Sequence, residues 1–246
     1  LSLNMIPNLK STWSAAGIAL GRPFLLFLMG LALGSCRKET LDLAFKACPG
    51  MATVTDVEGN SYRTTQIGAQ CWMRENLRTE KFRNGQDVDW VKGDSAWLRA
   101  SVGAYAYYNN NELNVEDYGV LYNQFAATDP RGLCPSGWRV PTDADWWELD
   151  NVLKDADRSG GVLKDTLMWD SVNVAAENFL GFGALPGGYR LSSGEFGGLG
   201  IQGYWWSSTN SGSGRGWNRQ LHNVSTGFFR NSKFLTFGMS VRCIKE

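Results

Sequence analysis

Glycine is the residue type that most constrains this chain, because it favours turns and weakens continuous helices. The 246 residues include 29 glycines, and nine of these lie between Gly181 and Gly203. Glycine adopts backbone conformations that other residues avoid, and it lowers helix stability. A phosphate-binding glycine loop would lead into a helix, but no helical pattern or Gly-Lys-Ser/Thr motif follows here. These glycines therefore predict turns and close backbone approaches in a domain with few helices.

The charge balance and the single histidine narrow the functional classes. The chain carries 24 basic and 24 acidic residues, and from Cys36 onward 22 basic residues face 24 acidic ones. Nucleic-acid binding requires a basic surface that neutralises phosphates, so we expect no nucleic-acid partner. His222 is the only histidine, which argues against a histidine-based zinc site or a Ser-His-Asp triad. We expect no metal, no cofactor and no enzymatic activity.

The N-terminal region predicts export and lipidation. An uncharged apolar run over residues 24–35 follows a basic residue and is too short to span a bilayer. The sequence Leu-Gly-Ser-Cys that ends at Cys36 resembles the bacterial lipobox, whose cysteine becomes the lipidated first residue. We expect a signal peptide over 1–35, a lipidated N-terminus and linker over 36–47, and a domain over 48–246. The alternative is a buried apolar helix, but the polar residues that follow Cys36 at once argue against it.

The remaining four cysteines predict disulfides, since exported proteins commonly contain them. Four cysteines allow three pairings, and free buried thiols are a further alternative. We expect Cys48–Cys71, which closes a short loop across an expected hairpin, and Cys134–Cys243, which ties the middle of the chain to its end. No CxxC motif indicates a redox site or a zinc knuckle.

Short strands dominate the expected secondary structure. A turn cluster at residues 58–60 separates two β-prone runs and predicts a hairpin, and residues 70–73 are a further strand candidate. Residues 84–118 have no sustained period and are expected to form irregular loop around short elements. The C-terminal region predicts an antiparallel meander. Its expected strands cover residues 204–208, 217–221, 228–230 and 240–244.

One helix is clearly expected, and it starts after Thr142. Asp145 lies three residues beyond Thr142, which is typical of a capping box, and apolar residues then follow at helical spacing in Trp146, Leu149 and Leu153. The helix also carries several acids: Asp143, Asp145, Glu148 and Asp150. Near a helix N-terminus we interpret such acids as dipole partners on a solvated face rather than as a metal or acid–base site.

Seven ordered motifs give the sequence a specific resemblance. They are Asp56-x-x-Gly59-Asn60-x-Tyr62; Ile67-Gly68-x-Gln70-Cys71-Trp72-Met73-x-Glu75-Asn76-Leu77; Tyr118-Gly119-x-Leu121-Tyr122-Asn123; Cys134-Pro135-x-Gly137-Trp138-Arg139-x-Pro141-Thr142-Asp143; Ala184-Leu185-Pro186-Gly187-Gly188; Trp205-Trp206-Ser207-Ser208; and Ser240-Val241-Arg242-Cys243. Over residues 48–245 the chain resembles the Fibrobacter succinogenes major paralogous (FISUMP) domain, found in exported proteins and lipoproteins, largely of Bacteroidetes and Fibrobacteres. The family usually has histidine where this chain has Arg139, which further lowers the case for metal or acid–base chemistry there.

The resemblance implies a C-type-lectin-like fold with small twisted antiparallel sheets, few helices, long loops and two disulfides. The residue patterns described above also predict an α+β protein made mostly of loop and strand. The variable proteins of diversity-generating retroelements share this fold group, and their C-terminal stretch is mutated to alter binding. Residues 205–243 are similar in layout.

The leading functional hypothesis is an outer-membrane lipoprotein, facing the cell surface, that binds a protein or glycan ligand. Aromatic and adaptable polar residues of the C-terminal region would form its binding surface: Trp217, Asn218, Arg219, His222, Asn223, Arg230 and Asn231. Trp217 fits core and surface equally, whereas Phe228 and Phe229 are favoured as core. We expect that replacing Asn218, Arg219, Asn223 and Asn231 together removes binding with little effect on the melting temperature.

Two alternatives remain. Exposed aromatic rings stack on sugars, which would make the protein a lectin. The Glu-Pro-Asn and Gln-Pro-Asp motifs of the calcium-dependent lectins of this fold are absent. An enzyme related to the formylglycine-generating enzymes would need a catalytic cysteine pair, whereas every cysteine here already has a structural or lipidation role in our assignment.

Overall fold

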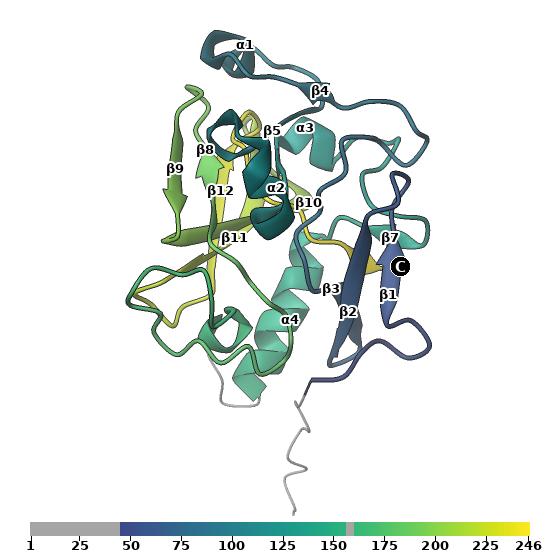
Figure 1. Ribbon diagram of the computed structural model, residues 1–246, viewed down its shortest axis with the longest axis vertical. Helices are drawn as coiled ribbons and strands as arrows, with labels where there is room; N and C mark the ends of the chain where they lie inside the picture. Colours follow the sequence, from purple (N-terminus) through teal and green to yellow (C-terminus); the bar gives the residue numbers. More distant parts are fainter. Residues whose placement is uncertain (1–44, 156–159) are drawn as a thin grey trace, which may run out of the picture. The chain divides into compact units, whose positions relative to one another are not determined.

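The computed structural model describes residues 45–155 and 160–246, which form three sheets and a few helices (Figure 1). The expected signal peptide, the lipidation site Cys36 and most of the expected linker lie outside the described residues. Within the described residues, no helix is both long enough and apolar enough to cross a membrane.

The first sheet contains five short strands in the order β1-β2-β3-β13-β7, and all neighbours are antiparallel. The predicted hairpin is confirmed, because Thr55 pairs with Ser61 on either side of the turn. The Asp56 carboxylate accepts the backbone N–H groups of Glu58 and Asn60, each at 2.9 Å, and so holds the turn closed. The strands are β1 (Thr53–Thr55), β2 (Ser61–Ile67), β3 (Gln70–Met73), β7 (Trp138–Arg139) and β13 (Ile244–Lys245).

The second sheet has the order β12-β11-β10-β8-β9 and contains the longest strands. Its strands are β8 (Gly187–Arg190), β9 (Phe196–Leu199), β10 (Gln202–Gly212), β11 (Arg215–His222) and β12 (Phe229–Phe234). The meander β10-β11-β12 is antiparallel as predicted, and β8 joins β10 in parallel.

The prediction that residues 240–244 form the last strand of the meander is wrong. Ser240 forms only an isolated bridge with Trp205, and the chain then continues to β13 in the first sheet. The disulfide of Cys243 with Cys134 accounts for this path, because Cys134 lies just before β7, which pairs with β13.

The remaining elements are short, as expected for residues 84–118. A three-stranded sheet joins β4 (Asp89–Trp90), β5 (Ala104–Ala106) and β6 (Leu121–Tyr122). The short helices are α1 (Asp94–Leu98), α2 (Val115–Tyr118) and α3 (Gln124–Ala127), with 3₁₀ turns η1 (Tyr108–Asn110), η2 (Glu112–Asn114) and η3 (Gly160–Leu163).

The long helix α4 (Asp143–Asp155) begins where the sequence predicts. The Asp145 backbone N–H donates to Thr142 Oγ1 at 3.2 Å, and the Thr142 backbone N–H donates to Asp145 Oδ2 at 2.6 Å. This reciprocal pair is a capping box with aspartate in place of glutamate. The helix buries Trp146, Leu149 and Leu153 on one side, as predicted.

Two hydrophobic cores lie on opposite faces of β10, because successive side chains of a strand point to opposite sides. Trp205 belongs to the core under α4, with Trp146 and Leu221. Trp206 belongs to the other core, with Tyr122. Both indoles are fully buried and donate hydrogen bonds, Trp205 to Asn76 Oδ1 and Trp206 to the Tyr122 carbonyl, each at 2.8 Å. Strand β10 is therefore held rigidly from both sides.

Both predicted disulfides are present, Cys48–Cys71 and Cys134–Cys243. The α+β class, with mostly antiparallel strands, few helices in the described residues and two disulfides, is confirmed. The arrangement is compatible with the C-type-lectin-like fold that the resemblance implies.

Candidate functional site

The pleat of β11 divides the predicted site residues between two faces of the sheet. Trp217 and Arg219 point to one side, and Arg230, paired with Arg219 on β12, joins them. Asn218 and His222 point to the other side, together with Asn231, which is paired with Asn218. The seven residues therefore do not form one surface.

We call the first side the arginine face. It consists of Arg215, Trp217 and Arg219 of β11 and Arg230, Ser232 and Phe234 of β12.

Cations and aromatic rings are stacked along the arginine face. The Arg230 guanidinium lies 3.3 Å from the centre of the Trp217 ring, and the Arg215 guanidinium lies 4.5 Å from the Phe234 ring. Arg215 also donates to the carbonyl of Ser232 at 2.8 Å. Such cation–π contacts hold long side chains in defined positions on an exposed surface. Trp217 is half-buried and Phe234 is 55% exposed, so this row is accessible to a ligand.

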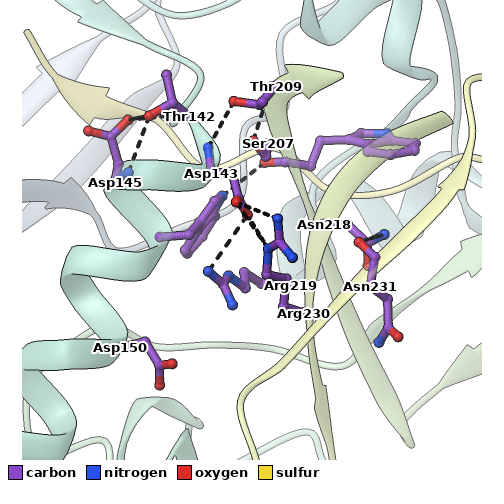
Figure 2. Close-up of polar contacts among 12 residues, drawn as sticks. Thr142, Asp143, Asp145, Asp150, Ser207, Thr209, Asn218, Arg219, Arg230 and Asn231 are labelled. Atoms are coloured by element: carbon purple, nitrogen blue, oxygen red, sulfur yellow. Dashed lines mark hydrogen bonds and ion pairs between the residues drawn. The ribbon is translucent and has the colours of Figure 1, made fainter. Parts of the chain in front are cut away.

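Asp143 joins the arginine face to the first turn of α4 (Figure 2). Arg230 Nε donates to both carboxylate oxygens of Asp143 at 3.0 Å, and its Nη2 lies 2.9 Å from Oδ2. Arg219 Nη2 lies 3.7 Å from Asp143 Oδ1. The backbone N–H of Asp143 donates to Thr209 Oγ1 at 3.0 Å, which also fixes the helix start to β10. One carboxylate thus serves two arginines from adjacent strands.

Arg219 is a buried cation with few partners. Its side chain is 1% exposed, and its Nε and Nη2 have no hydrogen-bond partner among the described residues. Burial lowers the pKa of Arg219 below its usual range, and the negative charges of Asp143 and Asp150 oppose that shift. Arg219 therefore depends on Asp143 for charge compensation.

The acids of α4 are less solvated than the sequence indicates. Asp143 binds the two arginines, and Asp145 forms a two-pronged ion pair with Arg139 at 2.6 and 2.9 Å. Burial opposes ionisation of Asp145, but hydrogen bonds from Arg139 and Thr142 outweigh it and hold its pKa below the usual value. The interpretation of Asp143 and Asp145 as parts of a solvated face is wrong, because arginines outside the helix reach both.

The opposite side of the two strands is an amide face, made of Asn218, Gln220 and His222 of β11 and Phe229, Asn231 and Lys233 of β12. Its amide side chains form hydrogen bonds with one another and with neighbouring groups of the same fold. Asn218 Nδ2 donates to the Asn231 carbonyl at 3.0 Å, and Asn231 Nδ2 donates to Gln220 Oε1 at 3.0 Å. Gln220 Nε2 in turn donates to the hydroxyl of buried Tyr204 at 2.7 Å. This network connects β10, β11 and β12, so its side chains stabilise the sheet.

Burial corrects the predicted set of contact residues. Asn218, Arg219 and Asn223 are 1%, 1% and 8% exposed, so their side chains lie inside the fold. Replacing Asn218, Arg219, Asn223 and Asn231 together would remove a buried cation and buried amides, so the structure predicts a lowered melting temperature in place of the small change expected from the sequence. Phe229 is 41% exposed and is not a core residue, whereas Phe228 packs partly against the core under α4.

Sequence reasoning missed three contributors to this site, Arg215, Phe234 and Asp143. Reading β11 at alternate positions would have placed Arg215 beside Trp217 and Arg219. Charge distribution offers a second signal, because no acidic residue lies between Glu195 and Glu246. That stretch must therefore find a counter-ion elsewhere, and Asp143 supplies it.

Two small hollows in the described residues lie away from the arginine face. Two hollows of about 260 and 250 Å³ share Arg83, Leu133 and Cys134 in their walls. Drug-sized ligands usually occupy pockets of roughly 300–1,000 Å³. In residues 45–155 and 160–246, no group of three or more His, Cys, Asp or Glu residues is placed to hold a metal ion. The accessible arginine face is therefore the strongest candidate site in the described chain.

Comparison with protein families gives a match to the Fibrobacter succinogenes major domain over residues 65–245. The chain belongs to this family. Within this Fibrobacter succinogenes major domain, the match includes α4, both faces of β11 and β12, and the Cys134–Cys243 disulfide. Comparison with curated proteins and with solved structures finds no match.

Proposed function

We propose that the protein is an exported, lipid-anchored binding module whose ligand-binding surface is the arginine face. The observation that supports this best is the accessible stack of Arg230 on Trp217, which an ion pair with Asp143 of α4 holds in position. Aromatic residues and arginine dominate the binding energy of many interfaces. Here both are pre-arranged, so little conformational entropy is lost when a ligand binds.

The scaffold behind this surface favours binding over catalysis. Trp205 and Cys243 are fully buried, and Cys243 is disulfide-bonded, whereas residues between them reach the surface on β11 and β12. Binding residues are commonly carried on segments that a rigid scaffold positions. This arrangement also supports the finer proposal of a variable protein of a diversity-generating retroelement, in which residues 205–243 carry the variation.

The side chains available for chemistry support the same proposal. Cys48, Cys71, Cys134 and Cys243 are all disulfide-bonded, so none offers the thiol that a formylglycine-generating type of reaction needs. Burial, with the nearby positive charge of Lys164, lowers the pKa of His222. His222 contacts Gln220 rather than a nucleophile. We propose a function that uses neither a cofactor nor a catalytic residue.

The anchor and its membrane complete the proposal. We propose that Cys36 is lipidated, that the protein resides in the outer membrane and faces the cell surface, and that its partner is a protein or glycan. The lipobox-like sequence before Cys36 supports this.

An array of glycans and proteins, probed with the full-length protein, tests the proposed surface. Every hit is then measured with Trp217→Ala and Arg230→Gln on the arginine face, and with Phe229→Ala as the matched exposed aromatic on the amide face. We expect the two arginine-face variants to lose binding by about tenfold or more and Phe229→Ala to retain it. Loss with Phe229→Ala alone would contradict the proposed surface.

A further inference from the structure

The C-terminal stretch of the sequence carries an excess of positive charge in a chain whose net charge is zero. Residues 196–245 contain no acid and six bases: Arg215, Arg219, Arg230, Lys233, Arg242 and Lys245. Arg219 and Arg242 are buried, whereas Arg215, Arg230 and Lys233 reach the surface of β11 and β12. Asp143 is the only acid that forms an ion pair with the arginine face among the described residues. A local cationic surface of this kind attracts an anionic ligand.

The aromatic rings beside these cations limit the type of anion. Phe234 is 55% exposed next to Arg215, and Trp217 lies under Arg230. Trp147, 52% exposed, lies one helical turn beyond Asp143 and therefore on the same side of α4. Planar guanidinium groups bind carboxylate and sulfate oxygens in pairs, and aromatic rings offer broad apolar faces. Together they suit a ligand that combines charged groups with flat apolar C–H surfaces, as acidic sugars do.

The shape of the surface favours a chain over a single small molecule. Arg215 and Trp217 of β11 alternate along the strand, about 7 Å apart, and Arg230 and Phe234 of β12 continue this accessible row beside them. Arg230 and the 55% exposed Phe234 lie at opposite ends of this row, so it reaches solvent at more than one position. An extended polymer can contact several positions of such a row at once.

The edge of the sheet argues against a peptide that adds as a further strand. β12 is one of the two edge strands of its sheet and the one that carries part of the arginine face, so a peptide that extends the sheet at this face would pair with it. It carries Arg230 and Lys233, and charged side chains on an edge strand disfavour strand addition. The carbonyls of Asn231 and Ser232 also accept hydrogen bonds from Asn218 and Arg215.

Resting on the binding role proposed above, we propose that the arginine face binds an acidic polysaccharide, one that carries carboxylate or sulfate groups along its chain. Arg215 and Arg230 bind the anionic groups, and Trp217 and Phe234 pack against the sugar rings. Arg219 and Asp143 lie beneath this surface and position Arg230.

Binding assays with four polymers of matched length test whether the ligand is an acidic polysaccharide. The full-length protein is titrated with polygalacturonate, which carries carboxylates, with dextran sulfate, with neutral dextran and with poly-L-glutamate. We expect polygalacturonate or dextran sulfate to bind at least about tenfold more tightly than either control polymer, since charge-assisted pairs and ring packing act together. Whichever of the two binds more tightly identifies the anionic group.

Variants connect the affinity to the residues. Arg215→Gln and Arg230→Gln are each expected to weaken binding by about tenfold. Lys245→Gln is the matched control, because it removes one exposed positive charge from the other five-stranded sheet, and a change below about twofold is expected. Trp217→Ala is expected to weaken binding of the polysaccharide, whereas Trp217→Phe is expected to retain most of the affinity. The reason is that the face of the aromatic ring, and not the indole N–H, makes the contact.

The outcomes separate this inference from the proposed function. Equal binding to dextran would overturn the role of charge, equal or tighter binding to poly-L-glutamate would overturn the sugar, and no binding to either acidic polysaccharide would overturn both. In each case, array hits that are lost in Trp217→Ala would still support the arginine face as a binding surface. Equal losses in Arg230→Gln and Lys245→Gln would indicate general charge attraction and would also overturn the inference.

Discussion

The dependence of Arg219 on Asp143 for charge compensation predicts a strong coupling between two substitutions, Asp143→Asn and Arg219→Met. Asp143→Asn removes the carboxylate that faces Arg219 at 3.7 Å and leaves a guanidinium that is 1% exposed without that counter-charge. Arg219→Met removes the buried charge while keeping a long apolar side chain in its place. The two substitutions should therefore have opposite effects on the free energy of unfolding.

The magnitudes follow from burial and hydrogen bonding. Removing one partner of a buried ion pair typically costs 3–5 kcal/mol. Asp143 is 20% exposed and its contact with Arg219 is long, so we expect a loss of about 2–3 kcal/mol for Asp143→Asn. Arg219→Met removes two buried nitrogen atoms that have no hydrogen-bond partner in the described residues. We therefore expect the free energy of unfolding to rise by about 1–2 kcal/mol.

A double-mutant cycle isolates the pair. With Arg219→Met already present, Asp143→Asn disturbs only the more exposed contact with Arg230 and the helix N-terminus, and it should cost about 1 kcal/mol or less. The predicted coupling is therefore about 2 kcal/mol. Effects of the substitution on the helix dipole occur in both backgrounds and cancel in the cycle.

Urea unfolding of the four proteins, followed by tryptophan fluorescence, measures this coupling. At the melting midpoint, 1 kcal/mol corresponds to about 2–4 °C for a domain of this size, so calorimetry provides a second readout. Glu148→Gln, which removes an exposed acid from the same helix, is the matched control and should change stability by less than about 0.5 kcal/mol. A coupling below about 0.5 kcal/mol would refute Asp143 as the counter-ion of Arg219.

Three further predictions concern the disulfide, pH and the anchor. Replacing Cys134 and Cys243 by alanine should lower stability by about 2–5 kcal/mol in urea unfolding, since the bridge closes a loop between residues 109 positions apart. The lowered pKa of His222 means that the unfolded chain takes up its proton first, so the melting temperature should fall as pH drops from 7 to 5.5. His222→Asn should flatten that fall, because the chain has no other histidine. Cys36→Ala should move the protein from the membrane fraction to the soluble fraction or leave it uncleaved, and normal membrane partitioning would contradict lipidation.

Local signals were sufficient to predict much of the fold. The turn at Asp56–Asn60, the capping box at Thr142 and the pairing of the four cysteines each depend on nearby residues or on a small number of combinations. The final strand could not be placed in this way. Whether Ile244 extends the meander or joins β3 and β7 depends on long-range packing, which no sequence period records.

The candidate site was predicted only in part, for a related reason. Composition indicated that β11 and β12 carry aromatic, arginine and amide side chains, and Trp217 and Arg230 do lie on an accessible face. Composition does not state which face of a strand is covered. Asn218 is buried on one side of β11, where it donates to the Asn231 carbonyl of β12, and Arg219 is buried on the other side, where it meets Asp143 of α4.

Hydroxyl-radical footprinting of the full-length protein, with and without a bound acidic polysaccharide, shows whether the ligand covers the arginine face. We expect oxidation of Trp217 and Phe234 to fall on binding, whereas oxidation of Phe229, which is 41% exposed on the amide face, stays unchanged. Protection of Phe229 with unchanged oxidation of Trp217 and Phe234 would contradict binding at the arginine face.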